Sequence, residues 1–173
     1  MHPGYLREVM MSTLHLETSP RATDVAGARL VRYQGPAAVR AIGHELSHLD
    51  QVAAASDGRG RSAWLESTID ADSTQVLTLS MDGRLVGYIA GSVDGALIDM
   101  TRVVLPAGVV THQPQALQAL VEGFLDAQAM PWADVRVEPG SPAVPYLLAE
   151  GWAPARRETD DPGTLVLTGS AAR

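Results

Sequence analysis

Alternation of apolar and polar residues is the clearest pattern in this chain, and it lies between residues 75 and 105. Three apolar runs of strand length, at 75–81, 84–93 and 96–105, are separated by the pairs Asp82-Gly83 and Asp94-Gly95. An Asp-Gly pair between such runs favours a tight two-residue turn, because that turn needs positive φ angles. The pattern therefore predicts three consecutive antiparallel strands.

The apolar period changes after these strands. From residue 115 to residue 129 the apolar positions follow helical spacing and share one face: Leu117, Leu120, Val121 and Phe124. Residues 107–114, which lie between the last strand and this helix, follow neither period. We expect a loop of eight residues there, at the place where a binding site would be built.

The first part of the chain predicts fewer elements. Residues 1–26 mix Pro, Ser, Thr and charged residues without a sustained period, and we expect them to be loosely ordered. Residues 28–33 read as a strand, and a short helical piece is expected near 64–69. A single helix is expected over 36–55, because its apolar residues form one stripe: Val39, Ile42, Leu46 and Leu49.

The last part of the chain returns to short elements. Residues 133–138 alternate like a strand, and 141–150 read as a short helix. Gly151 is placed to end that helix as its C-cap. Two closing strands are expected over 152–158 and 164–168.

Composition narrows the classes of function. A chain of 173 residues is long enough for one full core, and we expect residues 27–173 to form a single domain. The absence of cysteine excludes disulfides and thiolate catalysis. A net charge of -7 argues against a nucleic-acid partner. No apolar run approaches a membrane span or a secretory signal, so we expect a cytoplasmic protein without a membrane partner.

The predicted order of elements resembles the GNAT acetyltransferase superfamily over about residues 28–168. Residues 103–106 (V-V-L-P) are similar to the end of the family's fourth strand, and 146–152 (Y-L-L-A-E-G-W) to a late family segment. The resemblance implies an α+β, three-layer fold with helices on both faces of a mostly antiparallel sheet. It also implies about six or seven strands, splayed between the fourth and fifth, which here are 96–105 and 133–138.

The resemblance implies an activity as well. It implies transfer of an acetyl or other acyl group from CoA to an amine of a small molecule or peptide, without a metal, in a protein that can form a homodimer. The acyl-CoA would lie along the fourth strand, the following loop and the segment after the fifth strand. The residues so implied are Val103, Val104, Leu105, Val109, Val110, Thr111, His112, Gln113 and Ser141.

The loop itself departs from the family pattern. The family carries Arg or Gln and then two glycines there, and this chain has Val109, His112 and Pro114 instead. Glycine lets the backbone approach a phosphate closely, whereas β-branched residues resist the conformation and Pro114 removes an amide donor. This leaves a second hypothesis open, that the chain has the fold but has lost acyl-CoA chemistry and serves as a binding module or catalyses another reaction.

Three residues are candidates for catalysis. Asp99 in the fourth strand and Glu138 at the end of the fifth are alternative general bases for the amine. The resemblance makes Tyr146 the candidate acid that protonates the leaving thiolate. The family's tyrosine position is occupied by Leu147, so Tyr146 stands one residue early, which on a helix is about 100° of rotation.

A third hypothesis comes from residues 44–48, which read H-E-L-S-H. This H-E-x-x-H spacing places two imidazoles one helical turn apart, as in zinc hydrolases, and Glu66 and Asp70 could complete such a site. His44 and His48 lie opposite the apolar stripe of their own helix. We therefore interpret them as residues of a solvated face or of the rim of a substrate cleft.

Overall fold

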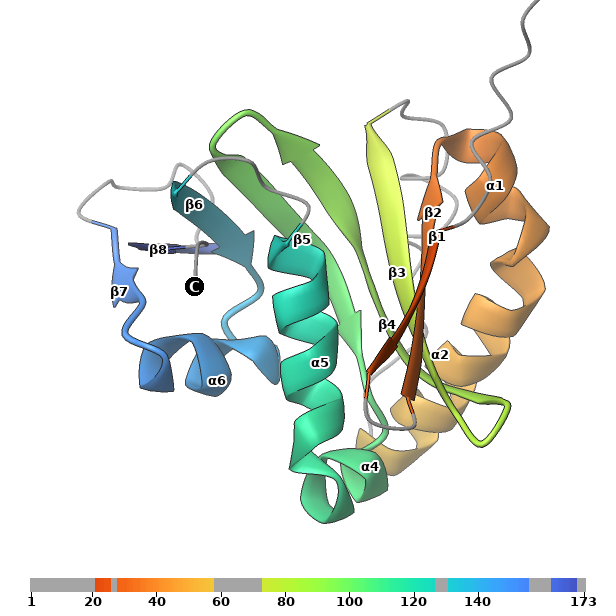
Figure 1. Ribbon diagram of the computed structural model, residues 1–173. Coiled ribbons are helices and arrows are strands. Elements are labelled where there is room, and N and C mark those ends of the chain that lie inside the picture. Colours follow the sequence, from red (N-terminus) through yellow and green to blue (C-terminus); the bar gives the residue numbers. More distant parts are fainter. Residues whose placement is uncertain (1–20, 26–27, 58–72, 127–130, 156–162, 171–173) are drawn as a thin grey trace, which may run out of the picture.

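The computed structural model describes residues 21–25, 28–57, 73–126, 131–155 and 163–170. In this part of the chain, helices cover both faces of one twisted sheet of eight strands (Figure 1). The order of the strands is β1-β2-β3-β4-β5-β6-β8-β7. The α+β fold with helices on both faces is confirmed, and the sheet contains more strands than the six or seven expected.

Most elements follow the predicted positions. The strands are β1 (Arg21–Val25), β2 (Ala28–Gln34), β3 (Thr74–Met81), β4 (Arg84–Asp94), β5 (Leu97–Val104), β6 (Trp132–Val137), β7 (Ala153–Pro154) and β8 (Leu165–Ser170). The helices are α1 (Pro36–Ala41), α2 (Gly43–Asp57), α4 (Ala107–His112), α5 (Pro114–Leu125) and α6 (Ala143–Ala149). The predicted helical piece at 64–69 lies outside the described residues.

The three predicted central strands are confirmed as β3, β4 and β5, which pair antiparallel. Asp82 and Gly83 both have positive φ, at 50° and 75°, as the tight turn between β3 and β4 requires. β5 and β6 form a parallel pair, and the other pairs in the sheet are antiparallel. The additional strand is β1, which pairs with β2 and corrects the expectation of loose order for Arg21–Val25.

The two faces of the sheet bury two separate apolar clusters, because successive side chains of a strand point to opposite faces. On one face, α5 and α6 cover a large cluster that includes Leu77, Ile89 and Phe124. On the other face, α1 and α2 cover a smaller cluster that includes Leu46 and Tyr88. We call these the α5 face and the α2 face of the sheet.

The helix expected over 36–55 is interrupted. It divides into α1 and α2 at Ile42, which has φ -108° and ψ 7°, and Gly43 begins the second helix. The predicted apolar stripe is still the buried one, since Val39, Leu46 and Leu49 pack in the cluster of the α2 face. The apolar period therefore predicted the buried side correctly, although the backbone breaks within it.

The expectation of an eight-residue loop at 107–114 is wrong. Residues Ala107–His112 form α4, and Pro114 already begins α5. The carbonyl of Pro106 accepts hydrogen bonds from the amides of Val109 and Val110, at 2.8 and 3.2 Å, which closes the first turn. Proline suits both positions, because Pro106 caps one helix and Pro114 needs no amide donor in the first turn of the next.

The end of the chain follows the prediction closely. Helix α6 ends at Ala149 with Glu150 as its C-cap, and Gly151 follows with a φ of 89°, the left-handed residue expected where the helix ends. The amide of Trp152 donates to the carbonyl of Leu147 at 3.0 Å and turns the chain into β7. The strands β7 and β8 are shorter than expected or shifted by a few residues, and 156–162 lies outside the described part.

Candidate functional site

The sheet opens between β5 and β6. The two strands pair from Leu97 with Asp134 to Met100 with Val137, and no pairing continues beyond that point in the described sheet. β5 continues to Val104 with only β4 beside it. The other backbone edge of this second half of β5 pairs with no strand that the structure describes. An uncovered strand edge can accept hydrogen bonds from another extended chain. This confirms the splay between the strands predicted as fourth and fifth.

A β-bulge in β5 lies at the point where β5 and β6 separate. Between the pairs Ala90–Arg102 and Ser92–Asp99, β5 has two residues and β4 has only Gly91. A Cβ atom added to Gly91 would lie 1.7 Å from the carbonyl oxygen of Asp99, so only glycine fits opposite the bulge. An extra residue of this kind interrupts the ladder and changes the direction of the side chains that follow it.

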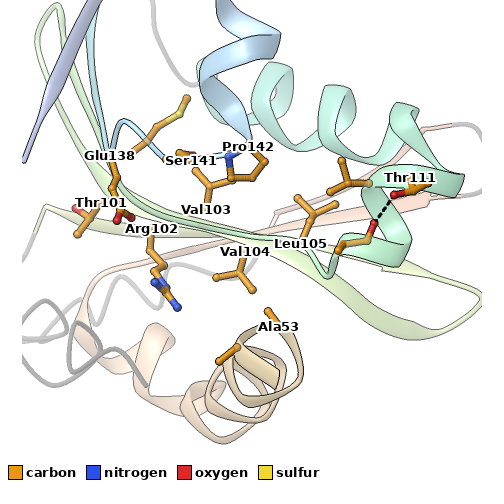
Figure 2. Close-up of a pocket in the computed structure, with 15 residues that line it drawn as sticks. Ala53, Thr101, Arg102, Val103, Val104, Leu105, Thr111, Glu138, Ser141 and Pro142 are labelled. Carbon is orange, nitrogen blue, oxygen red and sulfur yellow. Dashed lines mark hydrogen bonds between the residues drawn. The ribbon is translucent and has the colours of Figure 1, made fainter. Parts of the chain in front are cut away.

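The bulge changes the alternation of side chains along β5, so that even-numbered residues point to one face of the sheet before it and to the other face after it. Before it, Ile98 and Met100 pack in the cluster of the α5 face. After it, Val104 packs in the cluster of the α2 face. Arg102 is two residues from Val104 and points to the same α2 face, as Figure 2 shows. The bulge therefore brings a charged side chain to the α2 face at the mouth of the splay.

A cavity of about 330 Å³ occupies the splay. Its volume lies at the lower end of the range for small-molecule sites, roughly 300 to 1,000 Å³. We call it the splay cavity, and its walls come from α2, β5, α4 and the segment after β6 (Figure 2). The lining residues are Ala53, Ala54, Met100, Thr101, Arg102, Val103, Val104, Leu105, Ala107, Val110, Thr111, Glu138, Gly140, Ser141 and Pro142.

The structure places most of the residues predicted for acyl-CoA around this cavity. Those that line it are Val103, Val104, Leu105, Val110, Thr111 and Ser141. Val109 packs instead against the cluster of the α5 face, and His112 and Gln113 are not part of the lining. Ser141 is 7% exposed, and its Oγ accepts a hydrogen bond from the amide of Ala143 at 3.3 Å.

The polar atoms of α4 are largely engaged within the helix. Thr111 Oγ1 donates to the carbonyl of Ala107 at 2.9 Å, and a ring nitrogen of His112 lies 3.0 Å from the carbonyl of Gly108. The amide of Gln113 donates to the carbonyl of Val109 at 2.8 Å. The face of α4 toward the cavity therefore consists mainly of the apolar side chains of Ala107 and Val110.

The two candidate bases lie on the same face of the sheet. In the register of the parallel pair, Asp99 lies opposite Arg136, and Glu138 is the first residue after β6. Met100 packs in the cluster of the α5 face, so its neighbour Asp99 in β5 points to the α2 face. Figure 2 shows the side chain of Glu138 directed to the same side as that of Arg102. Glu138 lines the splay cavity, whereas Asp99 does not and accepts a hydrogen bond from Thr101 Oγ1 at 3.3 Å.

Tyr146 lies elsewhere. Its hydroxyl donates to Glu122 Oε1 of α5 at 2.9 Å, and it is not among the residues that line the cavity. Leu147, at the position where the family has its tyrosine, is fully buried. Tyr146 thus joins α6 to α5 in this structure, and its role as proton donor stays a prediction.

Three residues that were not predicted form a polar cluster at the cavity wall. Asp50 Oδ1 of α2 accepts hydrogen bonds from the hydroxyl of Tyr88 at 2.8 Å and from Nε and Nη2 of Arg102 at 3.3 and 3.1 Å. Asp50 belongs to the buried stripe of α2, next to Leu49 and one turn after Leu46. A carboxylate on a buried stripe needs a partner, and this signal was present in the sequence.

The contacts of this cluster fix the protonation states of Arg102 and Tyr88. Burial disfavours the charged form of Arg102, but the charge of Asp50, the hydrogen bonds that Asp50 accepts from Arg102 and the interaction with Tyr88 outweigh it and raise the pKa of Arg102. Burial, followed by the charge of Asp50 and its hydrogen bond, raises the pKa of Tyr88 well above its ordinary value of 10.0. Arg102 is therefore a permanent cation and Tyr88 a neutral donor.

The histidines of the H-E-L-S-H segment are separate from the cavity. His44, Glu45 and His48 are on α2, and none of the three lines the splay cavity. Within the described residues, no group of three or more His, Asp or Glu side chains could hold a metal ion. Glu66 and Asp70 lie outside the described part.

Comparison with known proteins gives likeness in structure and none in sequence. No protein-family model matches the chain, and no curated protein sequence matches it. A probable acetyltransferase of the GNAT family from Chromobacterium violaceum shares 12% identity at a TM-score of 0.58, over 87% of this chain and 91% of that one. The GNAT domain of S. lividans PAT shares 12% identity at a TM-score of 0.56, over 87% and 96%. An acetyltransferase from Thermus thermophilus shares 15% at 0.53, over 82% and 96%.

These likenesses cover most of both chains and show a common fold. Within the described residues, no helix has the length and apolar character needed to cross a membrane.

Proposed function

We propose that this chain, which has the GNAT acetyltransferase fold, transfers an acyl group from acyl-CoA to an amine. The observation that carries the proposal is the splay cavity, which lies where β5 loses its pairing with β6. It offers an extended ligand both an apolar wall and a strand edge. Acetyl-CoA is the simplest donor, and the amine belongs to a small molecule or a peptide.

The donor side of the site is the unpaired edge of β5. The pantetheine arm of CoA is an extended chain with two amide groups, and such a chain can pair with a strand edge as an added strand does. Val103, Leu105 and Val110 supply apolar contact for its methylene groups. The bulge at Met100 and Thr101 disturbs the ladder at the inner end of the splay, where a thioester carbonyl needs a backbone donor.

The acceptor side is the α2 face. The nitrogen of the amine attacks the thioester carbonyl carbon, the new C–N bond forms, and the C–S bond breaks. The nitrogen loses a proton to a carboxylate, and CoA leaves as the thiolate, which then takes up a proton. Glu138 is the better placed base, because it lines the cavity, and Asp99 is the alternative on the same face.

A second candidate function is supported by α4. A ring of free loop amides is the usual way to hold a pyrophosphate, together with the start of a helix. Here the amides of Val109, Val110 and Gln113 donate to carbonyls within this segment, and Pro114 has none. In this second function, the engaged amides do not hold the phosphates of CoA. The chain is then a GNAT-fold protein that binds a ligand without ordinary acyl-CoA chemistry.

Acetyl-CoA and acetyl-pantetheine distinguish the two functions. Both are titrated while thermal unfolding is followed, because a ligand of the native state raises the midpoint by mass action. We expect both to stabilise the protein, with the shorter ligand retaining most of the affinity. Failure of acetyl-CoA, other acyl-CoAs and acetyl-pantetheine to shift the midpoint at millimolar concentration would reject acyl transfer in favour of the second function.

A matched pair of variants locates the site. Ala107→Trp puts a large side chain at an exposed position that lines the cavity, and His112→Trp puts the same side chain at an exposed position of α4 outside the lining. We expect the first to abolish the shift by acetyl-pantetheine and the second to preserve it. Equal effects would show that the ligand does not occupy the splay cavity.

A further inference from the structure

Two charged side chains are found among the lining residues of the splay cavity, and they have opposite sign. They are Arg102 on β5 and Glu138 after β6. The parallel pairing of β5 and β6 ends at Met100 and Val137, and Glu138 is the residue that follows Val137 at the start of the splay. Both side chains point to the α2 face, the face assigned to the acceptor. The lining of the cavity therefore includes one cation and one anion, on the same side of the sheet.

The guanidinium of Arg102 is held from one edge only. Its Nε and Nη2 donate to Asp50, which also accepts the hydroxyl of Tyr88. A guanidinium has five N–H donors in a planar fork, and the edge formed by Nη1 and the outer hydrogen of Nη2 remains. Within the described part of the chain, Nε and Nη2 of Arg102 are engaged beside Asp50 and Tyr88, whereas Nη1 has no hydrogen-bond partner.

An arginine anchored in this way is suited to a second carboxylate. Asp50 and Tyr88 fix the guanidinium plane, so little conformational freedom remains to be lost when a ligand binds. The outer edge matches the two oxygens of a carboxylate, which gives two parallel charge-assisted hydrogen bonds. The Arg102 side chain is 20% exposed and lines the splay cavity, whereas the side chain of Asp50 is only 8% exposed, so the arginine is the accessible member of the pair.

We propose that the acyl acceptor is an amine that also carries a carboxylate, such as a free amino acid, bound with its carboxylate on Arg102 and its nitrogen toward Glu138. The inference rests on the proposed acyl transfer and names its substrate class. An acceptor with both groups would pair with both charges of the cavity. A plain alkylamine would leave the outer edge of Arg102 facing solvent or an unmatched apolar group.

Amino acids and their carboxamides test the proposal, because the two differ in one charge and share the same amine. We expect the kcat/KM of the wild-type protein with acetyl-CoA to be about 10 to 100 times higher for the amino acid, the range of charge-assisted hydrogen bonds. Arg102→Gln should remove this preference by lowering the value for the amino acid alone. Arg84→Gln, at an exposed position outside the cavity lining, is the matched control and should keep it.

Equilibrium binding provides a second test that needs no turnover. Calorimetric titration of the wild-type protein with amino acids and carboxamides should show about 10 to 100 times tighter binding of the amino acids. Equal binding, or a preference that survives in Arg102→Gln, overturns the proposal. A preference for malonyl-CoA over acetyl-CoA that depends on Arg102 would assign the carboxylate to the acyl group and also overturn it. Amino acid binding that depends on Arg102 in a protein without acyl transfer would keep the carboxylate site and reject the proposed activity.

Discussion

Arg102 of β5 and Asp50 of α2 form an ion pair at the wall of the splay cavity, with Nη2 of the arginine 3.1 Å from Oδ1 of the aspartate. The pair joins α2 to the second half of β5, where β5 no longer pairs with β6. Tyr88 of β4 donates to the same oxygen, so three elements meet at one carboxylate. This cluster stabilises the cavity wall and fixes the direction of the cation in it.

The first prediction concerns the charge of Asp50. Asp50→Asn keeps the shape of the side chain but leaves Arg102 without its counterion in a half-buried position. We expect the free energy of unfolding to fall by about 2–4 kcal/mol, measured by urea denaturation, since removal of one partner of a buried pair is costly. Asp94→Asn, at the exposed turn before Gly95, is the control and should leave stability unchanged. Equal stability of the two variants would contradict the role of the pair.

The second prediction concerns Tyr88 and alkaline pH. Its folded-state pKa is raised above the ordinary value of 10.0, so in that range the unfolded chain loses a proton that the folded chain keeps. Stability that is present below pH 10 is therefore lost as pH rises above it, by up to about 1.4 kcal/mol for each pH unit. Urea denaturation between pH 9 and 11 should show a weaker loss for Tyr88→Phe than for the wild type. Parallel curves for the two proteins would disprove the linkage.

The fold could be predicted from the sequence because its signals are local. Period-two alternation and two Asp-Gly pairs placed β3, β4 and β5, and Gly151 marked the end of α6. The break at Ile42 was missed, because the apolar stripe continues across it. Helix α4 was missed because six residues are too few to show a helical period. Its first turn is closed by the carbonyl of Pro106, and Val109 and Val110 pack against the cluster of the α5 face.

The site was predictable only in part. The resemblance implied that the end of β5 and Ser141 hold acyl-CoA, and both line the splay cavity. Arg102 was missed because its direction depends on the bulge opposite Gly91, which a regular alternation does not contain. Asp50 and Arg102 are 52 positions apart in the chain, so only the folded sheet and helix bring them together.

A third prediction concerns Tyr146, whose hydroxyl is bound to Glu122 outside the cavity lining. We expect Tyr146→Phe to cost about 1 kcal/mol of stability through the lost hydrogen bond and to keep kcat within a factor of about three. Steady-state kinetics with acetyl-CoA and an accepted amine would measure this. A fall in kcat of about 100-fold or more, with the fold intact, would instead assign the tyrosine to proton transfer.

A fourth prediction separates the two candidate bases. Glu138→Gln should lower kcat by about 100-fold or more, because positioned proton transfer contributes that much. Asp99→Asn should have a smaller effect, since Asp99 does not line the cavity. The pH dependence of kcat should lose its acidic limb only in the variant that removes the base. Full activity in both variants would reject both assignments.

The final prediction tests the bulge that shapes the site. Gly91→Ala places a methyl group 1.7 Å from the carbonyl oxygen of Asp99, so β5 must move or the bulge must be lost. Overpacking of this kind costs about 1–3 kcal/mol, and more where a backbone atom is the obstacle. Gly108→Ala is the control, because its added methyl group meets nothing within 4 Å and lies on α4, where alanine stabilises a helix.

In Gly91→Ala a register without the bulge would turn Arg102 away from Asp50, so Asp50→Asn should cost less stability there than in the wild type. Additive effects of the two substitutions would show that the bulge does not set the position of Arg102.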